Sequence, residues 1–201
     1  MTTIYLVRHG EYENPRQINP VRLKGFPLSN EGIVQMERNA NYFRNKNIKI
    51  IYSSPILRTK QSAQILKRLL KIPLIFSKSI IEVSSPIQGK SFLVLKEIEK
   101  YGDSFKLPYH LQKKGETVEH VYRRMKRLLK KILIKYQNKN VIIVSHGDPI
   151  MVLALIESGN PIDKQHAIHS YLSVLPYVPK GGIIKIEYNK TIFNSMEHIN
   201  F

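Results

Sequence analysis

The sequence predicts an α/β fold, a mostly parallel sheet with helices on both faces. Three observations support this prediction. Short apolar runs at residues 4–7, 48–52 and 141–144 have the length and composition of buried strands. Segments with the apolar period of helices lie between them, and this alternation is typical of a parallel sheet covered by helices. Histidine, arginine and serine residues follow directly after these runs, where such sheets form their ligand sites.

The first predicted strand, residues 4–7, leads into a polar loop and then a helix. The loop at residues 11–28 holds three prolines and shows no periodicity. We expect Ser29 to cap the helix, and Glu31 in the first turn suits the positive end of the helix dipole. The apolar face predicted for this helix consists of Ile33, Met36, Ala40 and Phe43.

The second strand, residues 48–52, is followed by a helix and a short third strand at residues 72–76. We expect Ser54 to cap this helix, with Pro55 at its first position, where a missing N–H costs nothing. The inward stripe of the helix is predicted as Thr59, Ser62, Ala63, Leu66, Leu69 and Leu70.

The least regular part of the chain begins at residue 80, and we expect the segment 83–115 to lie over the strand ends as a lid. A helix is predicted from Thr117. Its apolar stripe comprises Val118, Val121, Met125, Leu128, Leu129, Ile132 and Tyr136. Its opposite face carries a basic run, interpreted as a solvated helix face, of Arg123, Arg124, Lys126, Arg127, Lys130, Lys131 and Lys135.

The last predicted elements are two strands with a helix between them. Residues 141–144 form the fourth strand. Asp148 and Pro149 open a helix that runs to residue 156 and stops near Gly159. Residues 182–188 are predicted as a final strand at the edge of the sheet.

Length and composition favour a single domain, residues 1–201, which can bury roughly 70% of its unfolded surface. The absence of cysteine excludes disulfides, zinc–thiolate sites and cysteine nucleophiles. No apolar stretch approaches the roughly 20 residues that span a bilayer. Arg8 and His9 interrupt the early apolar run, so no signal peptide is visible. We therefore expect a cytoplasmic protein that does not contact membranes.

The net charge of +17 has two explanations. One is attraction to anions such as phosphorylated metabolites, polyphosphates or nucleic acid. The other is composition, because the whole chain is rich in Lys, Ile and Asn. We favour composition, since no arginine–aromatic patch or nucleic-acid-binding motif accompanies the charge, and we do not expect nucleic acid as a partner.

Polar side chains at three strand ends form the candidate site. Arg8 and His9 end the first strand, Arg58 follows the second, and His146 follows the fourth. The carboxyl ends of parallel strands meet at one edge of a sheet, where ligands bind. Two histidines and two arginines at this edge predict a phosphate site, because arginine forks match phosphate oxygens.

The same residues resemble the histidine phosphatase superfamily, the group that includes the phosphoglycerate mutases. The matching blocks are Arg-His-Gly-Glu at 8–11, Pro-Leu-Ser-Asn-Glu-Gly at 27–32, the segment 53–63 and Ser-His-Gly at 145–147. They stand in the family's order, and the resemblance covers about residues 3–188. It implies a phosphoglycerate mutase-like fold with the active site at the C-terminal ends of the strands.

The resemblance also implies a role for each residue. His9 would take the phosphoryl group and form a phosphohistidine, a reaction suited to an imidazole whose ordinary pKa of about 6.5 leaves much of it neutral at pH 7. Arg8 and Arg58 would hold the phosphate oxygens. His146 would be a further catalytic residue that contacts the transferred group.

Assignment of the proton donor depends on the glutamate that the family places after its third strand. Glu82 matches this position, although the family's usual tryptophan-glutamate-glycine continuation is missing. Glu11 is the alternative. Asn14 and Arg22 are candidates for substrate binding in a loop whose spacing departs from the family pattern. Glu116 is interpreted as a residue of a helix N-terminus and nothing more.

The remaining histidines give no basis for a metal site, and we expect neither a metal nor another cofactor. His166 and His169 could share a helical face, but no third ligand lies near them in the sequence. His110, His120 and His198 have no partner at a metal-binding spacing.

These observations predict a phosphomonoesterase that hydrolyses small phosphorylated metabolites through a phosphohistidine intermediate. One alternative is a phosphoglycerate mutase, but mutases of the family carry a longer insertion with paired arginines, where this chain has only Lys113 and Lys114. The other alternative is a non-catalytic anion- or nucleic-acid-binding protein on this scaffold, and the intact set of histidines and arginines argues against it. The physiological substrate and the oligomeric state stay open, a homodimer included.

Overall fold

The computed structural model describes residues 1–93, 115–160, 176–199 and 201. Its sheet confirms the predicted α/β class. The strands and helices in chain order are β1 (Thr2–Arg8), α1 (Asn30–Phe43), β2 (Ile48–Ser53), α2 (Leu57–Leu70), β3 (Leu74–Phe76), the 3₁₀ helix η1 (Lys78–Ile80), α5 (Val118–Lys135), β4 (Asn140–Ser145), α6 (Gly147–Glu157), β5 (Ile183–Asn189) and β6 (Ile192–Ile199).

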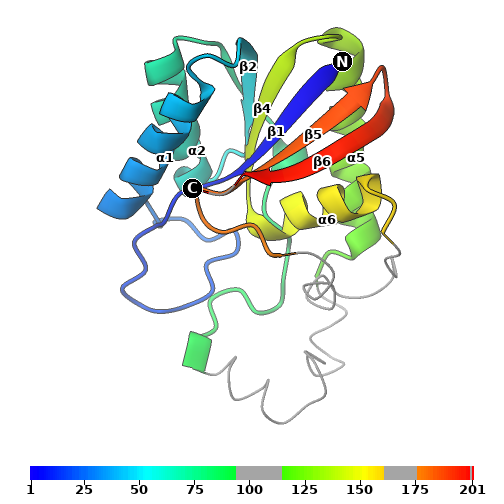
Figure 1. The fold of residues 1–201 in the computed structure, drawn as a ribbon. Coiled ribbons are helices and arrows are strands. Elements are labelled where there is room, and N and C mark those ends of the chain that lie inside the picture. Colours follow the sequence, from blue (N-terminus) through cyan, green and yellow to red (C-terminus); the bar gives the residue numbers. More distant parts are fainter. Residues whose placement is uncertain (94–114, 161–175, 200) are drawn as a thin grey trace.

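The six strands form one sheet in the order β3-β2-β4-β1-β5-β6. β1 to β4 are parallel to one another, whereas β5 runs antiparallel to β1. The sheet is therefore mostly parallel, as predicted. The carboxyl ends of β1, β2 and β4 meet at one edge, which is the lower edge in Figure 1.

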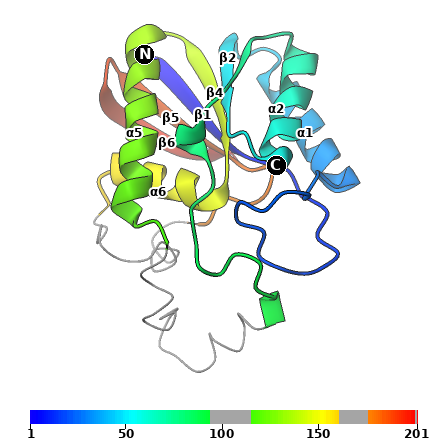
Figure 2. The same cartoon turned by 180° about the vertical axis from the view of Figure 1, so that it is seen from behind.

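Helices cover both faces of this sheet (Figures 1 and 2). α1 and α2 pack on one face, and α5 and α6 pack on the other. Side chains of β1 alternate between two apolar cores: Ile4 and Leu6 face α5 and α6, whereas Tyr5 and Val7 face α1 and α2. A strand buried on both faces is continuously apolar, which explains why these strands are recognisable in the sequence.

The predicted start of α1 is confirmed, but the predicted start of α2 is wrong. The Ser29 side chain accepts a hydrogen bond from the N–H of Gly32 and caps α1. The N-cap of α2 is Ile56, which makes no side-chain cap, so neither Ser54 nor Pro55 has the predicted position. The Ser54 hydroxyl is instead bound to His146 at the candidate site.

Two residues of the predicted apolar stripes are exposed. Ile33 of α1 is 37% exposed and lines a groove between α1 and α2. Leu69 of α2 is 45% exposed, because it lies in the last turn beside the short edge strand β3. In α1 the buried polar residue Asn39 joins the inward face, and its amide donates to the Gly181 carbonyl oxygen at 2.9 Å.

The two edges of the sheet also differ from the prediction. β3 begins at Leu74 rather than at residue 72. The predicted strand at 182–188 exists as β5, but it is not the edge strand, because β6 pairs antiparallel with it on the outside. β6 was not predicted, since its side chains are partly exposed and lack a clear apolar alternation. Among the described residues, no helix is long and apolar enough to cross a membrane.

The first part of the predicted lid at 83–115 packs on the loop after β1. The N–H of Asn19 donates to the Lys90 carbonyl oxygen at 2.9 Å, and the N–H of Gly89 donates to the Asn19 carbonyl oxygen at 2.8 Å. Both segments lie below the lower edge of the sheet in Figure 1. Residues 94–114 lie outside the described residues, so the lid stays a prediction.

Candidate active site

The strands position the two histidines of the candidate site. His9 follows β1 and His146 follows β4, and these strands pair in parallel with Arg8 opposite Ser145. The two imidazole rings therefore lie close together, with their centroids 5.2 Å apart. Both histidines are buried at the carboxyl edge of the sheet.

The hydrogen bonds of His9 define which ring nitrogen carries the proton and which holds the lone pair. Nδ1 lies 2.8 Å from the Gly10 carbonyl oxygen, which can only accept, so Nδ1 carries the proton. Nε2 accepts a hydrogen bond from Nε of Arg58 at 3.1 Å and therefore holds the lone pair. Burial, followed by the charges of Arg58 and Arg8, lowers the pKa of His9 well below 6.5. The ring is neutral near pH 7, as a nucleophile must be.

Two arginines beside His9 have buried donors that no described residue accepts. Arg58, in the first turn of α2, is 1% exposed, and its Nη2 donates to the Val21 carbonyl oxygen at 2.8 Å. Arg8 donates from Nη1 to the Val178 carbonyl oxygen at 2.9 Å. Nη1 of Arg58 and Nε of Arg8 are buried without a hydrogen-bond partner in the described part of the chain. Such donors are costly to leave unsatisfied, and they suit phosphate oxygens.

His146 has a polar contact at each ring nitrogen. Nδ1 lies 3.2 Å from Nη2 of Arg58, which can only donate, so Nδ1 accepts. Nε2 therefore carries the proton and donates to the Ser54 hydroxyl at 2.8 Å. Burial, followed by the charge of Arg58, lowers the pKa of His146 well below 6.5. Ser54 was missed as a site residue, although its position just after β2 places it at the same sheet edge.

Glu82 lies just after η1 and reaches the same cluster. Its Oε2 lies 3.4 Å from Nδ1 of His146 and 3.6 Å from Nη2 of Arg58. Its Oε1 accepts the N–H of Val83 at 2.9 Å. Burial, followed by the charge of Asp148, raises the pKa of Glu82 to about 7, against the opposing effect of Arg58. A carboxyl that holds its proton near neutral pH can act first as a general acid and then as a general base.

Glu11, the alternative proton donor, lies in a different set of contacts. Its Oε1 is 2.5 Å from Nζ of Lys180 and accepts the N–H of Tyr12 at 3.2 Å. The Lys180 ammonium also lies 4.6 Å from the centre of the Tyr12 ring. The geometry favours Glu82 over Glu11, because the Glu82 carboxylate is the one that contacts both His146 and Arg58.

The two predicted substrate-binding residues contact the protein's own backbone. The Asn14 amide donates to the Ile18 carbonyl oxygen at 2.9 Å and accepts the Ile18 N–H at 3.3 Å. Arg22 donates to the backbone oxygen of Glu82 at 2.7 Å and pairs with Glu116 at 2.6 Å. Substrate contacts of Asn14 and Arg22 stay predictions. The interpretation of Glu116 as only a helix-terminal residue is wrong, because its carboxylate binds Arg22.

Tyr177, which the sequence did not identify as a site residue, packs against the Arg8 guanidinium. The Arg8 guanidinium lies 5.0 Å from the centre of the Tyr177 ring, and the Tyr177 hydroxyl donates to Oδ1 of Asp148 at 2.7 Å. Burial, followed by the charge of Asp148, raises the pKa of Tyr177, so the hydroxyl keeps its proton. Gly147 leaves room for this arrangement, since a Cβ there would lie 2.0 Å from the Tyr177 hydroxyl oxygen.

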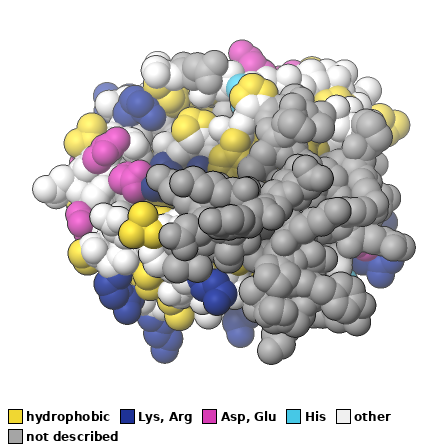
Figure 3. All heavy atoms as spheres, turned by 90° about the horizontal axis from the view of Figure 1, so that it is seen from below, with side chains coloured by type: hydrophobic (Ala, Val, Ile, Leu, Met, Phe, Trp, Pro, Cys, Tyr) yellow, Lys and Arg dark blue, Asp and Glu magenta, His cyan; other side chains and the backbone are white. Residues whose placement is uncertain are grey.

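The surface at this end of the molecule carries charges of both signs. Figure 3 shows lysine and arginine side chains around the described part of this face, with acidic side chains among them. Within the described residues, no group of three or more His, Cys, Asp or Glu side chains could hold a metal ion. His110, His166 and His169 lie outside those residues, so the expectation about them is untested.

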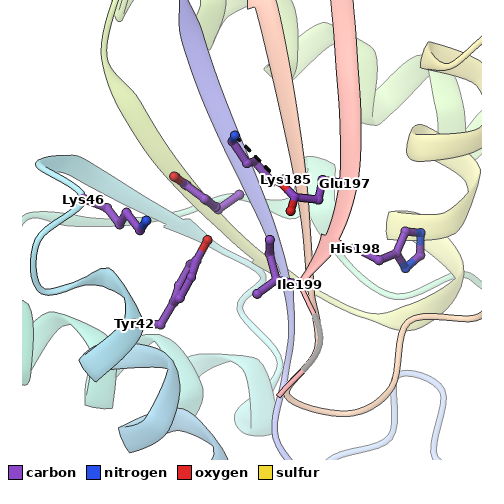
Figure 4. A pocket seen from close by; sticks show the side chains of 7 residues that line it. Tyr42, Lys46, Lys185, Glu197, His198 and Ile199 are labelled. Carbon is purple, nitrogen blue, oxygen red and sulfur yellow. Dashed lines mark ion pairs between the residues drawn. The ribbon is translucent and has the colours of Figure 1, made fainter.

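Away from the candidate site, a pocket of about 460 Å³ lies between α1 and the β5–β6 hairpin (Figure 4). Its Lys185 ammonium lies 2.9 Å from Glu187 and 3.9 Å from Glu197. Lys46 lies over the Tyr42 ring, 5.0 Å from its centre. Lys185 is therefore paired with carboxylates, whereas Nε2 of His198 is buried without a hydrogen-bond partner in the described part of the chain. No described arginine lines this pocket, in contrast to the cluster around His9.

Fold and site together define an α/β protein that is equipped to hold a phosphate beside a neutral histidine. Comparison with known families agrees with this class. The model of the histidine phosphatase superfamily (branch 1) matches residues 4–186. The chain therefore belongs to the histidine phosphatase superfamily.

Two relatives of this chain are named as phosphatases. The chain is 29% identical over 200 residues to the uncharacterized phosphatase PhoE of Bacillus subtilis, covering 94% of this chain and 95% of the relative. It is 30% identical over 173 residues to phosphoserine phosphatase 1 of Hydrogenobacter thermophilus, and the match covers 82% of this chain and 80% of the relative. The solved structure of Bacillus stearothermophilus YhfR superposes with a TM-score of 0.80 at 21% identity, covering 96% of this chain and 95% of that one. The last similarity confirms the predicted phosphoglycerate mutase-like fold.

Proposed function

We propose that this protein is a phosphomonoesterase that hydrolyses small phosphorylated metabolites through a phosphohistidine at His9. The observation that supports this most is the neutral His9 ring, whose Nε2 lone pair lies beside Arg58. Phosphoryl transfer needs such a nucleophile together with cations for the equatorial oxygens. Arg8 and Arg58 have unsatisfied buried donors that can bind these oxygens. The phosphatases among the relatives support hydrolysis as the reaction.

In the first step, Nε2 of His9 attacks the phosphorus atom, and the bond from phosphorus to the ester oxygen breaks. The leaving oxygen takes the proton of Glu82, whose raised pKa of about 7 keeps that proton available. Arg8, Arg58 and His146 contact the remaining oxygens. The products of this step are an alcohol, phosphohistidine and the Glu82 carboxylate.

In the second step, a water molecule attacks the phosphohistidine. The Glu82 carboxylate accepts one proton of this water as the new phosphorus–oxygen bond forms and the phosphorus–nitrogen bond breaks. The electron pair returns to Nε2 of His9, and inorganic phosphate leaves. A phosphoglycerate mutase differs at this step, because it returns the phosphoryl group to a bound metabolite instead of passing it to water.

The substrate class is proposed as small phosphorylated metabolites. The name of the Hydrogenobacter relative makes phosphoserine a first substrate to test. We place the protein in the cytoplasm, with the substrate as its main partner and without a role for nucleic acid. Light scattering of the purified protein would decide between a monomer and the homodimer that the sequence left open.

The proposal is tested by trapping the intermediate. The protein is mixed with an aryl phosphate, quenched without acid and digested, and the peptides are analysed by mass spectrometry. We expect phosphate on His9, none in His9→Ala, and normal labelling in His120→Ala, which removes an exposed histidine of α5. Phosphate on His146, or full activity in His9→Ala, would overturn the assignment. Efficient transfer within phosphoglycerate, with slow hydrolysis, would favour the mutase.

A further inference from the structure

Two arginines hold the backbone segment that carries Glu82. Nε of Arg22 donates to the Glu82 carbonyl oxygen at 2.7 Å, and Nη2 of Arg124 lies 3.4 Å from the same oxygen. Nη1 of Arg124 also donates to the Ser79 carbonyl oxygen at 2.8 Å. The segment between η1 and the lid belongs to neither a helix nor a strand. These side-chain contacts therefore take the place of a regular hydrogen-bond ladder.

One carboxylate joins the two arginines. Oε2 of Glu116 accepts from Nη2 of Arg22 at 2.6 Å and from the N–H of Ser84 at 2.9 Å. Oε1 of Glu116 accepts from Nε of Arg124 at 3.0 Å. Glu116 thus binds both guanidinium groups and the backbone two residues beyond Glu82. Charge-assisted hydrogen bonds of this kind are among the stronger ones, and here each partner is at least two-thirds buried.

Val21, the residue before Arg22, connects these contacts to Arg58. Val21 has a φ of +42°, which is strained for a β-branched residue, and its carbonyl oxygen accepts from Nη2 of Arg58 at 2.8 Å. The neighbours Val21 and Arg22 therefore contact Arg58 and the Glu82 backbone at the same time. Residues 21 and 22 therefore connect Arg58 to the segment that carries the proposed proton donor.

We propose that Glu116 is a positioning residue that acts through Arg22 and Arg124 to hold the Glu82 carboxyl against His146 and Arg58. The inference rests on the proposed role of Glu82 as proton donor. Glu116 itself does not touch the reacting atoms. Removal of the Glu116 carboxylate should therefore slow reactions in which Glu82 must protonate the leaving group. Reactions that need little protonation of the leaving group should be affected much less.

The first test compares Glu116→Gln with the control Glu119→Gln, which removes a carboxylate paired with the exposed Arg123 on the same helix. Misplacing a catalytic group by about 1 Å can cost about 100-fold in rate. We expect Glu116→Gln to lower kcat by about 10- to 100-fold for phosphoserine, an alkyl phosphate. We expect a much smaller loss for 4-nitrophenyl phosphate, whose leaving group needs little protonation, and little change in KM. Glu119→Gln should match the unmodified protein with both substrates.

The pH profile gives a second readout. Removing the Glu116 charge leaves Arg22 and Arg124 uncompensated near Glu82, and nearby positive charge favours the carboxylate. The pH above which kcat falls for phosphoserine should therefore move to lower pH in Glu116→Gln. An equal loss for both substrates with an unchanged pH profile would show a merely structural role and overturn the proposal.

A double variant tests whether Glu116 acts through Glu82. If it does, adding Glu116→Gln to Glu82→Gln should cause no further loss of kcat, because the positioned group is already absent. Multiplying losses would overturn the inference. A Glu82→Gln variant with full activity on phosphoserine would instead contradict the proposed proton donor, so the two failures are distinguishable.

Arg22→Lys covers the case in which Glu116→Gln does not fold. The Arg22 side chain is 32% exposed, so this change leaves the apolar core intact. Lysine keeps the charge but lacks the fork that reaches the Glu82 carbonyl oxygen and Glu116 together. We expect the same selective loss with phosphoserine. Equal rates for Arg22→Lys and the unmodified protein would overturn the proposal.

Discussion

Burial beside two arginines sets the charge of His9 and His146. Both residues are almost inaccessible, and their pKa values lie well below 6.5 in the folded protein. In the unfolded chain each imidazole returns to its ordinary pKa of about 6.5. The unfolded state therefore binds more protons below this pH, and the stability that is present above about pH 6.5 is lost as the pH falls.

This linkage predicts acid sensitivity from the histidines. Each buried histidine should remove up to about 1.4 kcal/mol of unfolding free energy per pH unit below about pH 6.5. Glu82 changes in the opposite direction, since its raised pKa makes stability fall as the pH rises from 4.5 to about 7. We therefore compare His146→Gln with the unmodified protein in urea unfolding at about pH 7.5 and about pH 5.5. The variant should lose less stability on acidification, whereas the exposed His120→Gln should lose as much as the unmodified protein.

The proton donor gives a prediction about leaving groups. If Glu82 protonates the ester oxygen, Glu82→Gln should lower kcat by about 10²- to 10⁴-fold for an alkyl phosphate and much less for an activated aryl phosphate. In the unmodified protein, kcat for the alkyl phosphate should fall as the pH rises through about 7, where the Glu82 carboxyl loses its proton. An unchanged rate of Glu82→Gln with alkyl phosphates would direct attention to Glu11.

Residue-level prediction from the sequence succeeded where a strand end decided the position. Arg8, His9 and His146 stand directly beside apolar runs, so a parallel sheet must bring them to one edge. Ser54 and Tyr177 were missed as site residues. Their contacts depend on side-chain directions and on chain segments far apart in the sequence, which no local pattern encodes.

Among the helices, the same expectation about serine caps gave two different outcomes. Ser29 accepts the N–H of Gly32 and caps α1, whereas Ser54 binds His146 and leaves α2 to begin at Leu57. Both serines stand just before a helical pattern, and the sequence alone does not distinguish them. The competing partner of Ser54 lies on β4, and it becomes visible only when the strands are paired.

The two serines should therefore respond differently to the same substitution. Ser29→Ala should lower the unfolding free energy by about 1 kcal/mol, the usual value of a helix cap, and change kcat little. In Ser54→Ala, the rise in the activation free energy derived from kcat should exceed the loss of unfolding free energy. The reason is that the substitution frees the ring of His146 from its hydroxyl partner. Urea unfolding and aryl phosphate turnover of the two variants test this. A stability loss without a kcat loss in Ser54→Ala would show that the contact between Ser54 and His146 supports the fold and not the reaction.

At the scale of the whole molecule, the alternation of apolar runs and helical periods was sufficient to predict a mostly parallel sheet with two helical layers. The antiparallel β5–β6 hairpin at its edge was only half predicted. A buried parallel strand is apolar on both faces, whereas β6 is partly exposed along its length and leaves a weaker pattern. The position of a strand in the sheet therefore decides how clearly the sequence reports it.

The net charge of +17 is also a property of the whole molecule, and it gives the last prediction. A positive field should speed the capture of anionic substrates, and salt should screen it, because the Debye length falls from about 30 Å at 0.01 M to about 10 Å at 0.1 M. We expect kcat/KM for a phosphate ester to fall as salt rises over this range, while kcat changes little. Reversing two exposed charges on α5, with Lys130→Glu and Lys131→Glu, should weaken this dependence without touching the site.

Lys130→Gln with Lys131→Gln is the matched control, since it removes half as much charge at the same two positions and should give an intermediate salt dependence. A kcat/KM that does not respond to salt in any of these proteins would leave the hydrolase in place. It would assign the charge to the lysine-rich composition of the chain, because a field that acts on substrate capture must respond to screening.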